Sequence, residues 1–231
     1  MKLKHIIFAL PFLFIINCSK KTNDPEFIKS ISGRYLYNSD EIVKIYFNES
    51  DLFMEWRGAK SIKPLKINDS TFFVKEMNEK IYFAVNPKDK KMYMVKIPKE
   101  ENQSVEYSFR MLDENEKTPS EYLMNNEFEK ALKNYQNIKE RDSLDESIKE
   151  SNLNSIGYRK LREKKYENAI EIFKINVALY PESSNVYDSL ADAFMRSGDT
   201  IQAIENYKKS LIYDSGNASA KRIIKRLEKK S

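Results

Sequence analysis

The chain has 231 residues, 41% of them apolar and 32% charged, with a formal net charge of +5. This composition is ordinary for a globular protein and excludes general disorder, and the length suits one large domain or two small ones. Residues 1–17 contain two of the 40 Lys and Arg residues, Lys2 and Lys4, so residues 18–231 contain 38 Lys and Arg and 35 Asp and Glu residues. The resulting charge of +3 is too mild to indicate nucleic-acid binding.

The N-terminal segment, 1–17, is typical of a secretory signal. Lys2 and Lys4 provide a basic start, and positions 6–16 form an apolar run that only Pro11 interrupts. This run is too short to cross a membrane as a helix, which takes roughly 20 residues. A basic start followed by a short apolar run instead predicts export.

The apolar run ends at Ile15-Ile16-Asn17-Cys18, and Cys18 is the single cysteine of the sequence. A lone thiol in an exported protein requires an explanation, and this stretch resembles the lipoprotein signals of bacteria. The resemblance implies cleavage after Asn17, acylation of Cys18 with palmitate-type chains, and a lipid anchor in the inner or outer membrane of the cell envelope. Asn17 departs from the usual Gly, Ala or Ser. A plain signal peptide and an uncleaved anchor are therefore the alternatives.

A polar tether is expected at 18–27, and an antiparallel β domain at 28–112. Short runs rich in Ile, Val, Tyr and Phe alternate there with Asn, Asp, Ser, Gly and Pro clusters, a pattern typical of strands and turns. Val105, Tyr107, Phe109 and Met111 alternate with polar residues, as half-buried strands do. The pattern predicts a small barrel or sandwich with eight strands at 32–37, 41–47, 51–56, 61–67, 71–75, 80–85, 91–97 and 104–112.

Several residues of this region occur in a familiar order: Gly33-Arg34-Tyr35, Val43, Ile45, Leu52, Gly58, Leu65, Phe72-Phe73 and Phe83. In that order they resemble the small β domain appended to many bacterial serine hydrolases of the β-lactamase and penicillin-binding type. An eight-stranded barrel is also large enough to hold one small ligand. Carriage of a small apolar ligand is therefore one alternative function for this domain.

After a hinge at 113–118, the segment 119–231 contains an internal repeat with a period of 34. Matched positions keep their size or polarity: Leu153 with Tyr187, Ile156 with Leu190, Gly157 with Ala191, Ala169 with Ala203, Phe173 with Tyr207, Val177 with Leu211 and Leu179 with Tyr213. These positions resemble the tetratricopeptide (TPR) pattern of paired helices. The register predicts helices at 152–163, 166–179, 186–197 and 200–213, a degenerate pair at 119–125 and 127–135, and a capping helix near 218–230. The expected fold is thus α+β and multidomain, with about two and a half TPR repeats.

The resemblance extends to the TPR tail of secreted bacterial hydrolases and esterases, carried by 154–158, 169–177, 180–181, 185–190 and 203–211. The hydrolase domain itself is missing. No serine precedes a lysine by three positions, and the sole histidine, His5, lies in the predicted signal. A Ser-His-Asp triad and histidine- or cysteine-rich zinc sites therefore cannot be built from the segment 18–231. We expect a non-enzyme without cofactor or metal.

In the TPR family the first helix of each repeat lines the concave groove. When the groove positions of the TPR family are transferred to this sequence by the repeat register, they fall on Asn154, Tyr158, Arg162, Asn185, Asp188, Asp192 and Arg196. Asp192 stands where chaperone-binding TPRs have a clamp asparagine, so an acidic peptide would be repelled and a neutral or basic segment is favoured. Asp188 and Asp192 lie one helical turn apart, but we expect groove residues rather than a catalytic pair.

The leading prediction is a non-catalytic, lipid-anchored protein of the cell envelope that binds a protein or peptide partner and no nucleic acid. An accessory or truncated relative of a secreted serine hydrolase is an alternative, with a hydrolase as the partner. The groove is alternatively filled by the protein's own β domain. The basic final helix, with Lys221, Arg222, Lys225 and Arg226, is either a contact with anionic lipid or the polar cap of the solenoid. The cap is the favoured interpretation.

Overall fold

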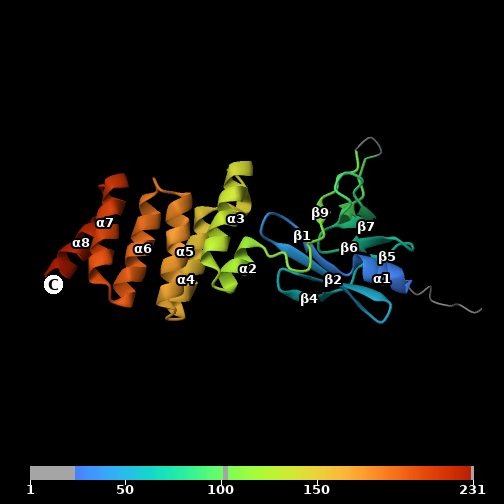
Figure 1. Cartoon of the computed structure of the whole chain (residues 1–231), viewed down its shortest axis with the longest axis horizontal. Coiled ribbons are helices and arrows are strands. Elements are labelled where there is room, and N and C mark those ends of the chain that lie inside the picture. The colour runs from blue at the N-terminus through green and yellow to red at the C-terminus, as the bar shows by residue number, and fades with distance from the viewer. Residues whose placement is uncertain (1–23, 101–103, 230–231) are drawn as a thin grey trace, which may run out of the picture.

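The computed structural model describes residues 24–100 and 104–229. The predicted signal, Cys18 and most of the tether lie outside these residues. A β module and a helical module follow one another along an elongated molecule, with α1 and the C-terminus at opposite ends (Figure 1). Among the described residues, no helix is sufficiently long and apolar to span a membrane.

The β module contains one short helix and nine strands within the described residues. The elements are α1 (Pro25–Ile31), β1 (Gly33–Leu36), β2 (Ile42–Asn48), β3 (Asp51–Trp56), β4 (Ala59–Ile62), β5 (Leu65–Lys66), β6 (Thr71–Val74), β7 (Glu79–Val85), β8 (Met92–Lys96) and β9 (Phe109–Arg110). They form two antiparallel sheets, ordered β1-β2-β3-β4 and β5-β6-β7-β8-β9. An isolated bridge between Tyr35 and Met111 joins the sheets at one edge only. The closed barrel is therefore wrong, and two sheets meeting at one edge replace it.

Two strand predictions need correction. The strand expected at 61–67 is divided into β4 and β5, because Pro64 lies between them and has no N–H for a ladder. The strand expected at 104–112 is reduced to β9. Other turns are as predicted: Asn38, Asn68 and Asn86 each accept a hydrogen bond from the backbone N–H of the second residue after them.

Helix α1 occupies part of the segment expected to be tether. The Asp24 side chain caps it, Pro25 starts it and Ile31 is buried. The Tyr35 hydroxyl donates to the Ile31 carbonyl at 2.8 Å, which ties the helix to β1. The core between the sheets is filled by side chains that are less than 2% exposed, among them Tyr35, Ile45, Met54, Phe72, Ile81 and Met94.

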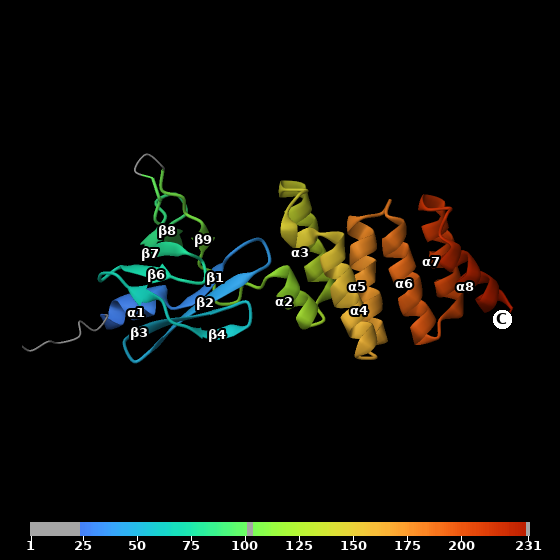
Figure 2. The same ribbon diagram turned by 180° about the vertical axis from the view of Figure 1, so that it is seen from behind.

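The helical module follows the predicted register. It comprises α2 (Pro119–Met124), α3 (Phe128–Arg141), the 3₁₀ turn η1 (Glu146–Ile148), α4 (Glu150–Arg162), α5 (Tyr166–Leu179), α6 (Ser184–Ser197), α7 (Thr200–Tyr213) and α8 (Ala218–Glu228). The starts of α4 and α6 are separated by the full repeat period, and so are the starts of α5 and α7. Two full repeats, an upstream helix pair and a last helix are therefore stacked side by side (Figures 1 and 2).

Close helix crossing explains the small residues at the repeat positions. A Cβ added to Gly157 of α4 would lie 2.5 Å from ring atoms of Phe173 of α5, so only glycine fits without movement. Phe173 itself is completely buried. The turns inside the repeats differ: Gly198 ends α6 with φ +94°, whereas Lys164 takes a left-handed φ of +59° after α4. Glycine adopts this conformation without a Cβ penalty, and lysine does not.

Candidate partner-binding surface

Helices α4, α6 and α8 lie side by side and share a strip of polar contacts. Asn185 of α6 donates to Glu150 of α4 at 2.6 Å. Asn217, the N-cap of α8, donates to Asp188 of α6 at 3.1 Å. These contacts run across all three helices, so the surface predicted from the repeat register is continuous and extends onto α8.

Asp192 is the centre of this strip. The Tyr158 hydroxyl donates to its Oδ2 at 3.1 Å, and the Tyr207 hydroxyl donates to its Oδ1. Burial and the nearby Asp192 charge raise the pKa of Tyr158 to about 12, and burial also raises the pKa of Tyr207. Both phenols are thus neutral donors at physiological pH. Asp192 and Tyr158, predicted as partner-binding residues, are therefore brought together and fix each other's position.

A second carboxylate lies one helical turn earlier. Asp188 is half-buried, and its burial followed by the charge of Asp192 raises the pKa of its carboxyl. Burial of a charged group is costly, so the Asn217 contact and the water-facing side of Asp188 partly offset that cost. Two neighbouring carboxylates make this part of the surface attractive to cations and repulsive to anions.

The remaining predicted residues differ in exposure. Arg162 and Arg196 are exposed, and each lies one turn further along its helix than Tyr158 or Asp192. Asn185 is exposed too, while Asn154 is half-buried and its Oδ1 is buried without a hydrogen-bond partner. The surface therefore has carboxylates and phenols at its centre and two free-standing guanidinium groups at one end.

A polar cleft of about 410 Å³ lies where the helical module meets the β module. The lining residues come from the β1–β2 and β3–β4 turns, α2, α3, η1 and α4, and they are Asn38, Asp40, Glu41, Arg57, Ser120, Tyr135, Glu146, Ser147, Asn152, Leu153 and Ile156. Its α4 residues, Asn152, Leu153 and Ile156, are not among the predicted groove residues, so the cleft is separate from the strip on α4, α6 and α8. The sequence did not reveal it, since its lining residues come from distant parts of the chain.

Asp40 in this cleft bridges the two modules. It accepts from the Ser120 N–H at 2.6 Å, the Ser120 hydroxyl at 2.5 Å and the Tyr135 hydroxyl at 2.9 Å. Burial raises the pKa of Asp40, although the hydrogen bonds oppose that shift, and burial likewise raises the pKa of Tyr135. The sequence showed Asp40 only as part of a turn, because its partners lie 80 and 95 positions away.

Further contacts brace the segment that was expected to act as a hinge. Arg34 of β1 donates to the Glu116 carbonyl at 2.8 Å and forms an ion pair with Glu121 of α2. Arg110 forms an ion pair with Glu116 as well. On the far side of the cleft, Arg141 donates to Ser39 at 2.7 Å. The surface of α4, α6 and α8 is therefore held in a defined position relative to the β module.

Within residues 24–100 and 104–229, no group of three or more His, Cys, Asp or Glu side chains is arranged to hold a metal ion. The surface presents hydrogen-bond donors and acceptors, the carboxylates of Glu150, Asp188 and Asp192, and the guanidinium groups of Arg162 and Arg196. This inventory suits recognition of a polypeptide, in which charged side chains and backbone groups are presented together.

No protein-family model matches the chain. Among curated proteins, it is similar to the uncharacterized protein ycf37 of Cyanophora paradoxa, with 31% identity over 107 residues. The match covers 46% of this chain and 62% of that protein, so the chain spans less than two thirds of this relative's length.

Solved structures that are similar over about half of the chain include two TPR domains and a secretion chaperone. The first TPR of Spaghetti (RPAP3) bound to an HSP90 peptide has 16% identity and a TM-score of 0.35, and the match covers 48% of this chain and 86% of that one. The Sgt2 TPR domain from Aspergillus fumigatus has 18% identity and a TM-score of 0.35, with 48% of this chain and 73% of that one covered. The Yersinia enterocolitica type III secretion chaperone SycD with a YopD peptide has 11% identity and a TM-score of 0.34, with 48% of this chain and 88% of that one covered. The TPR character of the helical module rests on the regular recurrence of its helix pairs, not on these scores.

Proposed function

We propose that this chain is a protein-interaction module that binds a segment of a partner protein along the surface of α4, α6 and α8. The observation that carries this proposal is the hydrogen-bonded strip from Glu150 to Asn217, which fixes the groove side chains before a partner arrives. Side chains that are already ordered lose little further entropy on binding. Stacked helical repeats commonly use such concave surfaces to bind extended segments.

The preferred segment is neutral or basic. Asp188 and Asp192 lie together at the centre of the surface, and the carboxylate of Glu150 is on the adjacent helix. A lysine or arginine side chain would relieve the repulsion between Asp188 and Asp192, whereas an acidic side chain would increase it. Arg162 and Arg196 at the end of the strip then favour a carbonyl or carboxylate group of the segment beyond its basic residue.

Peptide binding is the direct test of this preference. Three fluorescent peptides of equal length and matched apolar content, one basic, one neutral and one acidic, are titrated with the protein. We expect the basic and neutral peptides to bind. Asp188→Asn should weaken binding of the basic peptide about tenfold, since an ion pair of this kind contributes about 1.4 kcal/mol or more. Glu205→Gln on α7 removes an exposed carboxylate elsewhere and is the matched control. Tighter binding of the acidic peptide would contradict the proposal.

Cross-linking locates the surface. A photoreactive phenylalanine analogue at Arg162 of α4 is expected to form adducts with the bound peptide, while the same analogue at Lys174 of α5 is not. Both positions are exposed, so the two variants differ in location rather than accessibility. Equal yields at both positions would show that binding is not confined to the groove.

The proposed location is the bacterial cell envelope, with Cys18 as the lipid attachment site. Support comes from the sequence alone: the basic start, the short apolar run and the single cysteine at its end. Labelling with a fatty-acid analogue is expected to mark the wild-type chain and to leave Cys18→Ser unlabelled and uncleaved. Equal labelling of Cys18→Ser would refute the anchor. A secreted hydrolase is one partner class consistent with the resemblance of both modules to hydrolase tails.

The structure of the β module supports carriage of a small apolar ligand less well than the helical module supports peptide binding. The interior space that a carrier needs is occupied by its own side chains, with Tyr35, Met54, Phe72 and Met94 at most 1% exposed. A filled interior stabilises the module but leaves little room for a small molecule.

A further inference from the structure

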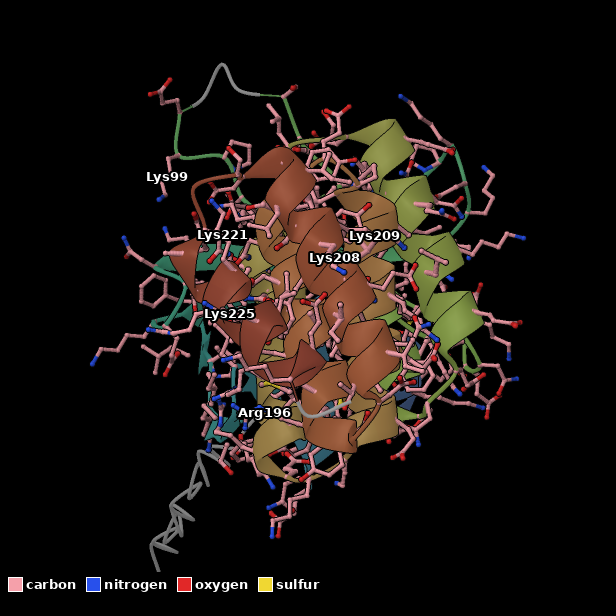
Figure 3. All side chains as sticks on the ribbon, turned by 90° about the vertical axis from the view of Figure 1, so that its left-hand side faces the viewer. Lys99, Arg196, Lys208, Lys209, Lys221 and Lys225 are labelled. Atoms are coloured by element: carbon pink, nitrogen blue, oxygen red, sulfur yellow. The ribbon has the colours of Figure 1, made fainter. Side chains whose placement is uncertain are left out.

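The outward side of α8 carries a dense group of positive charges. Ala220, Ile224 and Leu227 are buried against the preceding helix. At about 100° per residue, Arg222, Lys225 and Arg226 project to the opposite side and Lys221 to its edge, and all four are exposed. Figure 3 looks onto this end of the molecule, with Lys221 and Lys225 on α8.

Carboxylates do not neutralise this group. Glu228 is the one acidic residue of α8, and it pairs with Lys208 of α7 at 2.8 Å, at the border between the two helices. Arg226 also donates to the Met195 sulfur at 3.8 Å, which draws it towards α6. Lys221, Arg222 and Lys225 remain as a patch of one sign on the outer side of the last helix.

Apolar side chains border the patch. On α7, Ile201 and Ile212 are 79% and 76% exposed, and Lys208 lies between them at helical spacing on the same stripe. Glu205, also on this stripe, is paired with Lys209 at 2.9 Å. Lys208 and Lys209 are seen beside α8 on this end of the molecule (Figure 3). Ile201 and Ile212 are therefore aliphatic side chains that a surface approaching this end of the molecule can contact.

Cations that flank exposed aliphatic side chains match the chemistry of an anionic bilayer surface. Lipid phosphates attract Lys and Arg, and aliphatic side chains enter the region just below the headgroups. A nucleic acid would gain nothing from Ile201 and Ile212, because single strands are bound by stacking on aromatic rings and duplexes through phosphate and groove contacts. An acidic protein would match the charges but requires a complementary shape, whereas long Lys and Arg side chains adapt to a plane of mobile phosphates.

We propose that the end of the molecule formed by the outer side of α8 and the Ile201–Ile212 stripe of α7 docks on an anionic phospholipid bilayer. This contact is independent of the peptide-binding surface proposed above. It is also separate from the lipid anchor proposed at Cys18, because α8 lies at the opposite end of the molecule from α1 (Figures 1 and 2).

The test is co-sedimentation with vesicles. A chain that starts at Ser19 avoids the predicted signal and anchor and keeps all described residues, 24–100 and 104–229. It is expected to bind phosphatidylglycerol-containing vesicles and not pure phosphatidylcholine vesicles, with affinity falling as salt shortens the ~10 Å screening length found at 0.1 M. Each cation near such a surface contributes about a fivefold gain in affinity. The triple change Lys221→Gln, Arg222→Gln and Lys225→Gln should therefore weaken binding about a hundredfold.

The matched control removes three exposed lysines of the β module, Lys75→Gln, Lys80→Gln and Lys88→Gln, and thus the same total charge. We expect it to bind like the wild type, and circular dichroism to show both variants folded. Ile201→Ser with Ile212→Ser should weaken binding about tenfold. An unchanged affinity of that variant would remove the α7 stripe from the docking surface.

Three results would overturn the proposal. The first is an equal loss of vesicle binding in the α8 triple variant and in the β-module control. The second is equal binding of the protein to phosphatidylglycerol-containing and to pure phosphatidylcholine vesicles. The third is tighter binding to a DNA duplex or to polyglutamate than to anionic vesicles. The last result, if abolished by the α8 change, would assign the patch to a nucleic acid or to an acidic protein.

Discussion

Replacing Asp40 by alanine should uncouple the two modules. The change removes the acceptor of three hydrogen bonds, two from Ser120 and one from Tyr135. Each such bond contributes about 1 kcal/mol, which sums to about 3 kcal/mol. Burial raises the pKa of Asp40, so the cost of holding its charge there offsets part of this gain. The net loss is therefore less than about 3 kcal/mol, most of it in the contact between the modules.

Two spectroscopic probes can follow the modules separately. Trp56, the single tryptophan, is 8% exposed in the β module, with the Arg57 guanidinium 4.5 Å from its ring centroid. Its fluorescence reports unfolding of the β module, while far-ultraviolet circular dichroism is dominated by the helices. In the wild type we expect the two urea transitions to coincide, as they do when a protein unfolds cooperatively. In Asp40→Ala we expect them to separate.

Asp89→Ala is the control for this experiment. Asp89 also accepts from a tyrosine hydroxyl and a backbone N–H, at 2.7 Å from Tyr93 and 3.0 Å from Lys91, but entirely within the β module. It should shift both transitions slightly and by the same amount, because the Asp40 contacts still couple the modules. Wild-type transitions that are already separate, or coincident transitions in Asp40→Ala, would show that the Asp40 contacts do not couple the modules.

Three further predictions concern the repeats. Gly157→Ala should destabilise the helical module by about 1–2 kcal/mol in urea unfolding, since displacing Phe173 costs more than the roughly 1 kcal/mol that alanine gains in a helix. Adding Phe173→Leu to this variant should reduce the cost of the alanine. A Gly157→Ala protein as stable as the wild type would contradict the close crossing of α4 and α5. Lys164→Gly should stabilise the module by about 0.5–1 kcal/mol because of the positive φ, and a loss of stability would contradict it. The pKa of Tyr158 is raised to about 12, so the folded state keeps this proton at a pH where the unfolded state has lost it. This group should leave the free energy of unfolding unchanged below pH 10 and lower it between pH 10 and 12, and the fall should be smaller in Tyr158→Phe. An equal dependence of the free energy of unfolding on pH in both proteins would refute the assignment.

The helical module was predictable because its signals are local and repeated. Gly157, Ala191 and the aromatic residues after them recur with the repeat period, and the same spacing placed Tyr158 and Asp192 on one surface. Their hydrogen bond was not predictable, since register gives the side of a helix but not the rotamer. At the turn after α4, Lys164 takes the left-handed conformation that Gly198 has after α6.

The β module was less predictable for physical reasons. Strand alternation shows which residues face the core but not which strands pair, so the gap between β4 and β5 was missed and a closed barrel was expected. Pro64 was visible in the sequence and should have divided the 61–67 run. Helix α1 is too short to form on its own, and its stability depends on burial of Ile31 and on the hydrogen bond from the Tyr35 hydroxyl of β1. Asp40 gave no local signal for its contacts with α2 and α3.

At the end of the helical module, the need for a polar outer side and the presence of a uniformly positive outer side have different explanations. A capping helix has to be polar on its outer side because no further repeat covers it, and glutamate, glutamine or serine would meet that need as well as lysine. On α8, Lys221, Arg222 and Lys225 are of one sign, and the single acidic residue, Glu228, lies at the border with α7. Capping accounts for the polarity of this side but not for the uniform sign. The uniform charge, beside exposed Ile201 and Ile212, is the feature that a negatively charged bilayer explains.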